Sequence, residues 1–384
     1  GPVSRGDLEL MKDSDGQRGV ALLAALILTL AVVLVLSNIF YRHQIDVAQA
    51  GASMHRDQAL LLALSGESWA AQMLSDAQDD RSVDEFGEDW AQAMPLLPVE
   101  GGILTGCIAD MQARINLNNF ASYDAPTLRL EMDSENMGAA KVWTKLLDIL
   151  EFPTDPARVA RIIDWLDADS AAVNSWGAEQ PDYDNFSPPR VVANTRVSDV
   201  TELAAISGYE IWEVQRLAAW SSALPSDTAI NINTASDEIL LALSGTLNEP
   251  FVDRVLENRP FNTVADFHAM IANEFLLAPA DVSARWPPRI IDVKTDYFEL
   301  YLDVTLGEAH IELKSIMSRR GLKEPVVISR SITLVPASLP DRAPDKLSAA
   351  EALFADEARD EEIDRTDANK IAPEPACLMI GKNS

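Results

Sequence analysis

The chain has 384 residues, enough for a membrane anchor and two or three modest domains. Its formal net charge is −29, from 60 acidic and 31 basic residues, which argues against a nucleic-acid partner because phosphate binding depends mainly on lysine and arginine. The two cysteines, Cys107 and Cys377, would permit one disulfide in an oxidising compartment or stay as two thiols.

An apolar segment near the start of the chain, residues 20–41, predicts a membrane-spanning helix. It has no ionisable side chain except the hydroxyl of Tyr41, and Arg18 and Gly19 stand directly before it. About 20 apolar residues span the ~30 Å hydrocarbon core. A cleaved secretory segment is shorter, roughly 7–15 apolar residues followed by small residues, whereas this one ends in Arg42. We therefore interpret it as a retained anchor, with its basic flank favouring a cytoplasmic N-terminus.

The residues after the anchor predict a helix and then a hairpin. Helical spacing of apolar residues over 45–77 indicates that the membrane helix continues into the soluble region. The stretch 97–119 predicts a β-hairpin, with Gly101 and Gly102 near a strand start and apolar alternation extending through Ile115.

From residue 120 to 288 the pattern changes to short helices separated by prolines and glycines. We expect helices at 139–152, 156–168, 197–208, 209–220, 235–245, 249–258 and 263–273. Alternation returns over 296–334, with turns near Gly307 and Gly321, and predicts antiparallel strands. This order favours an α+β domain with a helical insert. The tail from residue 336 is rich in Asp, Glu, Ala and Pro, and we expect it to be disordered.

Two asparagine-rich stretches, "RINLNN" and "AININ", look like local repeats, and the second opens a pattern similar to the helix-hairpin-helix repeat of DNA-uptake receptors. In DNA-binding hairpins the turn presents backbone N–H groups to phosphate, helped by nearby lysine or arginine. Here Glu249 follows the turn and no lysine occurs between residues 223 and 284. We expect these repeats to act as packing modules whose core contains Ile232, Leu240, Leu243 and Phe267. A membrane-anchored DNA receptor is the alternative, which a salt-dependent gel shift would support.

The acidic loop 164–185 holds the densest set of oxygen ligands in the chain. Calcium takes six to eight oxygens from carboxylates, amides and carbonyls, although an acidic surface loop without an ion would have the same composition. The four histidines show no ligand spacing, so zinc is not expected. Because no catalytic constellation is visible, we predict a protein that is not an enzyme; an anchored periplasmic enzyme using this loop is a second alternative.

Several of these segments together resemble the type II secretion minor pseudopilins of the K type (general secretion pathway protein K family). The resemblance runs from about Gly16 to Leu334. It rests on "QRGVALLAALILTL", "LPVEGGILTGCIADMQARINLNN", "IIDWLDAD", "WGAEQPDYDNFSPPRVVANTRVSDVTEL" and "INTASDEILLAL" in that order. Most pilin-like subunits have a glutamate at the fifth mature position, and this chain has Ala24 there, as is typical of the K type.

The resemblance implies a type IV pilin-like α+β fold, with a long N-terminal helix packed on an antiparallel sheet and a large all-α insert containing helix-hairpin-helix-like (SAM-like) repeats. We expect six segments, namely a prepilin leader (1–19), the transmembrane helix (20–41), the pilin helix and first strands (42–119), the insert (120–290), the C-terminal strands (291–335) and the acidic tail (336–384).

The resemblance also implies the site residues and the partners. A prepilin peptidase would cut between Gly19 and Val20, and the family is methylated at the new N-terminus. Calcium would bind in the insert, where Asp167, Asp169 and Glu179 match the family's calcium loop, and the acidic loop adds Asp182 and Asn185 as further expected ligands. The implied partners are the I-type and J-type minor pseudopilins, other pseudopilins and the inner-membrane secretion platform. The implied role is structural, at the tip of a periplasmic pseudopilus that exports folded proteins across the outer membrane.

The leader junction gives a first testable prediction. Gly19 is the smallest residue that can precede the cut bond, and Arg18 keeps it at the cytoplasmic face. We expect Gly19→Leu to leave an uncleaved precursor, visible as a larger band on a gel. Edman sequencing that finds Val20 as the first residue of this variant would show that the site is elsewhere or tolerant.

Overall fold

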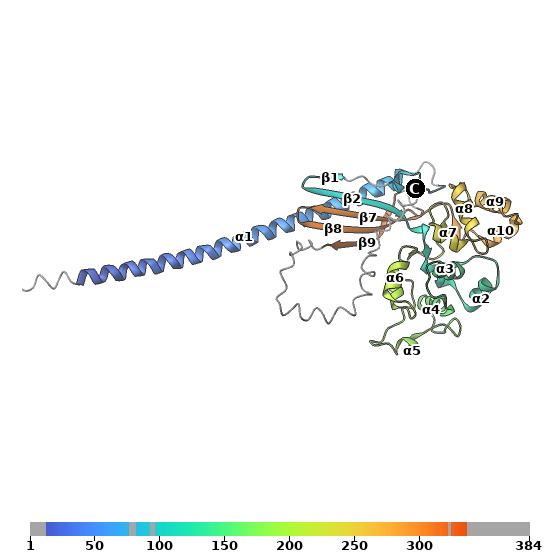
Figure 1. The fold of residues 1–384 in the computed structure, drawn as a ribbon, viewed down its shortest axis with the longest axis horizontal. Coiled ribbons are helices and arrows are strands. Elements are labelled where there is room, and N and C mark those ends of the chain that lie inside the picture. Colours follow the sequence, from blue (N-terminus) through green and yellow to red (C-terminus); the bar gives the residue numbers. More distant parts are fainter. Residues whose placement is uncertain (1–12, 77–81, 93–96, 322–323, 336–384) are drawn as a thin grey trace, which may run out of the picture.

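The computed structural model describes residues 13–76, 82–92, 97–321 and 324–335. The first twelve residues of the predicted leader, the tail from 336 and Cys377 lie outside the described residues, and the predictions made for them stay predictions. Helix α1 (Asp13–Asp76) is one continuous helix of 64 residues, as the spacing of apolar residues predicted (Figure 1). Every side chain from Val20 to Tyr41 is exposed, and only the C-terminal part of the helix reaches the sheet.

Five antiparallel strands form that sheet, in the order β1-β2-β7-β8-β9 (Figure 1). They are β1 (Leu97–Val99), β2 (Gly102–Asp110), β7 (Tyr297–Leu306), β8 (Ala309–Ser318) and β9 (Val326–Leu334). The turn between β7 and β8 contains Gly307 at φ +56°, a conformation that glycine adopts without strain. Because β2 and β7 are neighbours in space, the whole helical part is inserted between two adjacent strands of one sheet.

The strands predicted over 296–334 are confirmed, but the predicted first hairpin is wrong in its extent. The hairpin consists of β1 and β2 and ends at Asp110. There the Asp110 side chain accepts a hydrogen bond from the Gln112 N–H and starts a 3-10 turn, Met111–Ala113. That turn redirects the chain, so Ile115 pairs in parallel with Ser221 in the helical part instead of continuing the hairpin.

Helix α1 lies close to the sheet because the face that meets it carries small residues. Ala59, Ala63 and Ala70 are fully buried. A Cβ atom added to Gly66 would lie 2.8 Å from Leu302 Cδ1 on β7, well inside van der Waals contact. The small side chains therefore set the short distance between helix and sheet.

One carboxylate lies within this apolar contact and fixes the position of α1 along the sheet. Glu67 accepts hydrogen bonds from Ser315 Oγ on β8 (2.6 Å) and from Arg330 Nε on β9 (2.8 Å). Burial opposes ionisation of Glu67, but the hydrogen bonds from Arg330 and Ser315 outweigh it and hold its pKa below the ordinary value. The carboxylate thus joins one helix to two strands.

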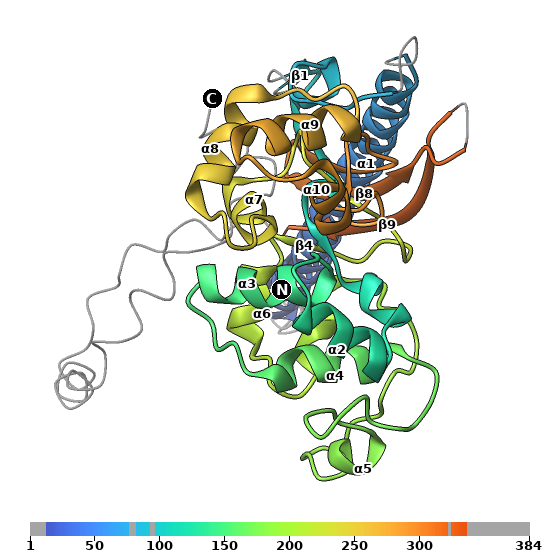
Figure 2. The same cartoon turned by 90° about the vertical axis from the view of Figure 1, so that its right-hand side faces the viewer.

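The inserted helices form two groups, seen one above the other in Figure 2. The first group contains β3 (Ile115–Asn116), α2 (Ala125–Asp133), α3 (Ala139–Ile149), α4 (Pro156–Leu166), α5 (Gln180–Tyr183), α6 (Ile211–Leu217) and β4 (Ser221–Ser222). The second contains β5 (Ile230–Asn231), α7 (Asp237–Leu243), α8 (Glu249–Asn258), α9 (Val264–Glu274), α10 (Pro279–Arg285) and β6 (Ile291–Asp292). Helices α3 and α7 pack on each other, and one continuous apolar core serves both groups.

Each helical group is closed by a short parallel pair of strands, β3 with β4 and β5 with β6, and asparagines hold both closures. Asn116 accepts from the Leu224 N–H (2.9 Å) and donates to the Pro225 carbonyl (2.8 Å). Asn233 accepts from the Phe261 N–H (2.9 Å) and donates to the Phe261 carbonyl (3.0 Å). The resemblance between the two asparagine-rich stretches therefore reflects a shared structural task, the satisfaction of buried backbone groups.

Most of the predicted helices are present, and the predicted core of the second group is confirmed. Its four residues are fully buried, namely Ile232, Leu240, Leu243 and Phe267. The helix predicted at 197–208 is wrong: only Val200–Ala205 is helical, and it is a 3-10 turn closed by a capping box between Asp199 and Glu202. Helices α2, α5 and α10 were not predicted, and all three begin with a proline in their first turn.

The sheet and the helical part are joined through the buried carboxylate of Asp110. Its Oδ2 accepts from Thr234 Oγ1 (2.5 Å), Thr295 Oγ1 (2.5 Å) and Asn231 Nδ2 (3.0 Å). Beside it Asp84 pairs with Arg319 in a second buried contact, which strengthens the same joint. Burial raises the pKa of Asp110 to about 6, although the donated hydrogen bonds lower it.

Removing this carboxylate should loosen the whole molecule. Asp110→Ala removes the acceptor of the Thr234 and Thr295 hydroxyls and of the Gln112 N–H, together with one hydrogen bond of the Asn231 amide. Each buried group left unsatisfied costs about 1–3 kcal/mol. We expect the free energy of unfolding to fall by roughly 3 kcal/mol or more. Thermal unfolding of the full chain in detergent, followed by tryptophan fluorescence, measures the change. The control is Asp148→Ala on the exposed side of α3, and equal losses in both variants would contradict the role assigned to Asp110.

Candidate metal centre

The acidic loop lies between α4 and α5, and the buried carboxylate of Asp164 shapes it. Asp164 Oδ1 accepts from the Val173 N–H (2.8 Å) and Oδ2 from the Ala178 N–H (2.7 Å). A Cβ atom on Gly177 would lie 2.0 Å from Asp164 Oδ2, so the loop can close only on a glycine at this position. Both carboxylate oxygens of Asp164 therefore bind backbone N–H groups, and these hydrogen bonds fix the conformation of the loop.

Three other carboxylates converge where the loop begins and ends. Asp167 caps the C-terminus of α4 and Glu179 caps the N-terminus of α5, with Asp169 in the loop between them. Each offers one oxygen, and the three oxygens lie within 4.8 Å of one another. Two buried atoms in this set, Asp167 Oδ1 and Glu179 Oε1, have no hydrogen-bond partner. Buried polar atoms are rarely left unpaired, so this geometry fits a bound cation.

The electrostatics of the cluster would favour a positive charge among these oxygens. Burial raises the pKa of Glu179 to about 7, and the negative charges of neighbouring aspartates raise it further. Burial likewise raises the pKa of Asp164 to about 6. The pKa of Asp167 is raised by burial and then by the charge of Asp169. An ion bound among these oxygens would offset all of these repulsions.

The other two predicted ligands, Asp182 and Asn185, lie on α5 and just after it. The Asp182 side chain accepts from the Glu179 N–H (3.0 Å), and the Glu179 side chain accepts from the Asp182 N–H, in a capping box. Asn185 donates from Nδ2 to the Pro181 carbonyl (2.9 Å). The structure therefore brings Asp167, Asp169 and Glu179 together and places Asp182 and Asn185 beside them in local hydrogen bonds.

Sequence reasoning missed Asn194 at this site. Its Nδ2 donates to the Asp169 carbonyl (2.8 Å), and its Oδ1 is buried without a partner. Asn194 also has a positive φ of +44°, which asparagine tolerates better than most residues. No spacing rule connects residues 169 and 194, so only the folded chain shows this contact.

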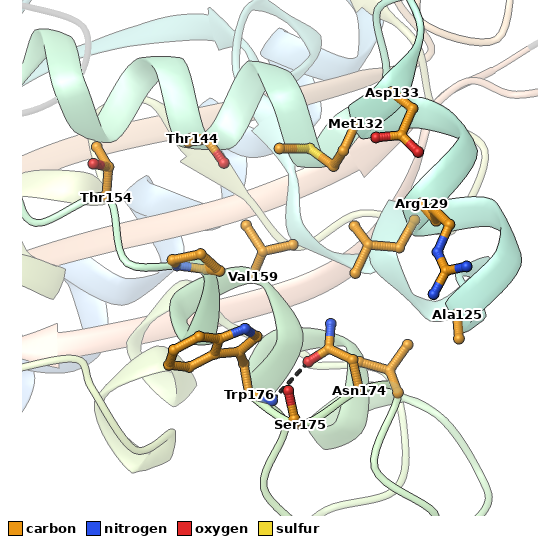
Figure 3. Close-up of a pocket in the computed structure, with 13 residues that line it drawn as sticks. Ala125, Arg129, Met132, Asp133, Thr144, Thr154, Val159, Asn174, Ser175 and Trp176 are labelled. Atoms are coloured by element: carbon orange, nitrogen blue, oxygen red, sulfur yellow. Dashed lines mark hydrogen bonds between the residues drawn. The ribbon is translucent and has the colours of Figure 1, made fainter.

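A cleft of about 620 Å³ lies beside the acidic loop (Figure 3). One wall is the segment from Val173 to Trp176, where the Trp176 N–H donates to Asn174 Oδ1 (2.8 Å). The opposite wall comes from α2 and includes Arg129 and Met132. Asp164, which accepts the hydrogen bond from the Val173 N–H, therefore also positions one wall of this cleft.

A second group of metal-ligand types, Asp303, His310 and Glu312, lies on the outer face of the sheet. His310 Nε2 lies 2.8 Å from Asp303 Oδ2, and all three side chains are partly exposed. This brings a histidine near two acids, which the sequence spacing did not predict. A hydrogen bond at the surface accounts for the contact between His310 and Asp303, and we assign no metal to this group.

Comparisons with known proteins agree with the resemblance found in the sequence. The family models described as "Type II secretion system (T2SS), protein K" match residues 113–226 and 230–277, which correspond to the two helical groups. Type II secretion system protein K of Aeromonas hydrophila is 32% identical, over 82% of this chain and 96% of that protein. The protein of the same name from Pectobacterium carotovorum is 30% identical, over 81% of this chain and 95% of that protein.

A solved structure shares the fold. It is described as the GspK-GspI-GspJ complex from the enterotoxigenic Escherichia coli type 2 secretion system, and the match has a TM-score of 0.63 and 23% identity. It covers 74% of this chain and 99% of that chain. The α+β fold predicted from the sequence, with a long apolar N-terminal helix, an antiparallel sheet and many inserted helices, is thereby confirmed. The chain belongs to the type II secretion system protein K family.

Proposed function

We propose that the chain is a structural minor pseudopilin that occupies the tip of the type II secretion pseudopilus, where it initiates or caps assembly. The observation that carries this proposal is the position of the helical insert. Both helical groups lie beyond the end of the sheet that faces away from the N-terminal half of α1 (Figure 1). A further subunit stacked beyond this end would meet the insert, so the end of a filament is the place that accommodates it.

The N-terminal part of α1 supports a single-pass anchor. Of the described helices, α1 is the one long and apolar enough to cross a membrane. We propose that its N-terminus is cytoplasmic and that the sheet and insert are periplasmic. After cleavage between Gly19 and Val20, Ala24 would occupy the fifth position. A carboxylate there could pair with a neighbouring subunit's N-terminal amine in lipid, and a subunit without it offers no such contact to a subunit ahead.

The proposed partners are the I-type and J-type minor pseudopilins, followed by other pseudopilins and the inner-membrane platform. The solved structure with the same fold is described as a complex of GspK with GspI and GspJ. A structural role in such an assembly needs docking surfaces and no reaction chemistry, so we propose that the chain has no catalytic activity.

The second helical group supports packing modules in preference to a DNA receptor. Helices α7 and α8 are joined by a turn containing Gly245 at φ +60°, and we propose that this unit is a helix-hairpin-helix repeat used for packing. The interior of the second helical group is aromatic. The rings of Phe251 and Trp286 stack with their centroids 5.4 Å apart, and the ring of Phe267 meets that of Phe251 edge-on with a centroid distance of 6.0 Å. Glu249 begins α8 at the turn, where a phosphate-binding hairpin would need a neutral or basic residue.

Calcium is the proposed ligand of the acidic loop. Asp167, Asp169 and Glu179 would hold it, and Asp182 and Asn185 remain proposed neighbours in the same site. Hard oxygen donors on a loop suit calcium better than magnesium, which demands a stricter octahedron. When bound, the ion supplies positive charge to three acids and so orders the loop and the adjoining wall of the cleft.

The position in the filament can be tested directly. Pseudopili assembled in cells should bind gold-labelled antibodies against the helical insert at one end only. Antibodies against the major subunit serve as the control and should label the whole length. Gold particles spaced along the shaft would contradict the tip assignment.

Calcium and pH should act on stability through Glu179. Its folded pKa of about 7 exceeds the ordinary value of 4.5, so the folded state holds this proton more tightly than the unfolded state. Stability therefore falls as pH rises between these values. Without calcium, we expect the melting temperature of the full chain in detergent to be lower at pH 8 than at pH 5. At pH 8, calcium at a hundredfold excess over its Kd should add about 2.7 kcal/mol.

Variants of the acidic residues distinguish a calcium-binding loop from a solvated loop that binds no ion. Asp167→Ala with Asp169→Ala should abolish the calcium effect. Glu179→Gln should do the same and should also reduce the calcium-free loss between pH 5 and pH 8. Asp148→Asn, an exposed acid on α3, is the matched control and should behave like the unmodified chain. Identical melting curves in calcium and in chelator would show that the loop binds no calcium.

A further inference from the structure

The two edges of the sheet are built differently. Strand β1 is three residues long and contains Pro98, which has no N–H to donate, so this edge resists pairing. Strand β9 has nine residues without proline. In the described sheet it pairs with β8 on one side only, so it forms the second edge. Proteins usually protect such an edge with short strands, prolines or exposed charges. Strand β9 is neither short nor interrupted by proline.

The charge that β9 does carry is turned inward. Arg330 is bound to Glu67 of α1, so it is neutralised instead of repelling an incoming strand. On the same face Ile332 pairs with Leu313 and Leu334 with Ile311, whose side chains belong to the core beneath α1. Ile332 is 45% exposed and Leu334 is 46% exposed. The apolar core thus continues to β9, where no described residue covers it.

We propose that β9 is a docking edge that takes an extended strand from a different pilin-like subunit anchored in the same membrane. This inference rests on the proposed function, because it names the surface through which the chain would join its assembly. The incoming strand would satisfy the free N–H and C=O groups of β9. It would present apolar side chains at alternate positions to cover Ile332 and Leu334.

The first ten residues of the chain's own tail are a poor occupant. Prolines at 336, 340 and 344 fall within the first ten residues after Val335. Each proline removes a donor from a ladder of hydrogen bonds, and prolines inside a paired strand are confined to edges and bulges. The residues that follow β9 directly therefore cannot pair back along it.

A second copy of the chain is also a poor occupant, for geometric and electrostatic reasons. The strands run roughly along α1 (Figure 1). Two β9 edges joined antiparallel would point the two anchors in opposite directions. Joined in parallel, the two sheets would face opposite ways, and the apolar row of one would meet Ser331 and Thr333 of the other. Each copy also carries a formal charge of −29, which repels its like. A different subunit could pair with β9 through the opposite edge of its own sheet, and then none of these obstacles applies.

The experiment compares two double variants of the full chain, co-expressed in the inner membrane with the I-type and J-type subunits of its own secretion system. Ile332→Lys with Leu334→Lys places two charges on the apolar row. Ser331→Lys with Thr333→Lys places the same charges on the opposite face of the same strand, opposite Lys314 and Glu312. We expect the first pair to reduce co-purification of the I- and J-type subunits by roughly tenfold, and the second pair to leave it near the unmodified level.

A cross-linking arm does not depend on the stability of the lysine variants. A benzophenone amino acid at Ile332 should cross-link to an I-type or J-type subunit, and at Ser331 it should give at least several-fold less product. Normal co-purification by both lysine variants, or a cross-link from Ile332 to a second copy, would overturn the docking proposal and leave the proposed function standing. If the unmodified chain captures neither subunit, the proposed function fails and the docking proposal falls with it.

Discussion

The carboxylate of Asp110 is the point at which three distant parts of the chain meet. It ends β2, and the groups that donate to it come from the start of the second helical group and from the return toward β7. Asn231 and Thr234 belong to the insert, and Thr295 belongs to the segment that returns from the insert to the sheet. A buried acid is costly unless its oxygens are fully bonded, and here four donors, including the Gln112 N–H, meet that requirement. The insert is therefore held to the sheet by a specific polar joint and not by a flexible linker.

This joint explains how a large helical insert can act as part of a filament subunit. The chain passes from sheet to insert and back at adjacent strands, β2 and β7, so the insert has one base. Gln112 reinforces that base by donating to the Ala229 and Lys294 carbonyls. These contacts keep the insert at a fixed angle to α1, as the proposed position at the end of a filament would require.

Much of this architecture could be predicted from the sequence because local physics dictates it. The membrane helix follows from an uninterrupted apolar run, and the last three strands follow from alternation with a period of two. The buried core of the second helical group followed from helical spacing. Where a cap outweighed the spacing, as at Asp199 and Glu202, the expected helix was reduced to a 3-10 turn.

The candidate site was predictable only in part. The acidic loop is visible in the sequence, and the family resemblance identified Asp167, Asp169 and Glu179. Which of the acids is bonded to backbone and which is left unpaired depends on the fold. Asp164, from the same acidic run, is used by the Val173 and Ala178 N–H groups, and Asn194 arrives from a separate segment. Burial of Glu179 is a tertiary effect, and no pattern of neighbours along the chain encodes it.

The uniform character of α1 has a consequence for how the subunit leaves the bilayer. From Val20 to Tyr41 the helix exposes apolar side chains on every side, and Ala24 stands where other pilin-like subunits carry an acid. Lipid tails and a packed bundle of helices are both apolar surroundings, so in the proposed filament this segment would exchange one hydrocarbon-like contact for another. Because the side chains from Val20 to Tyr41 include no carboxylate, moving this segment between two apolar surroundings would require no side-chain carboxylate to take up or release a proton.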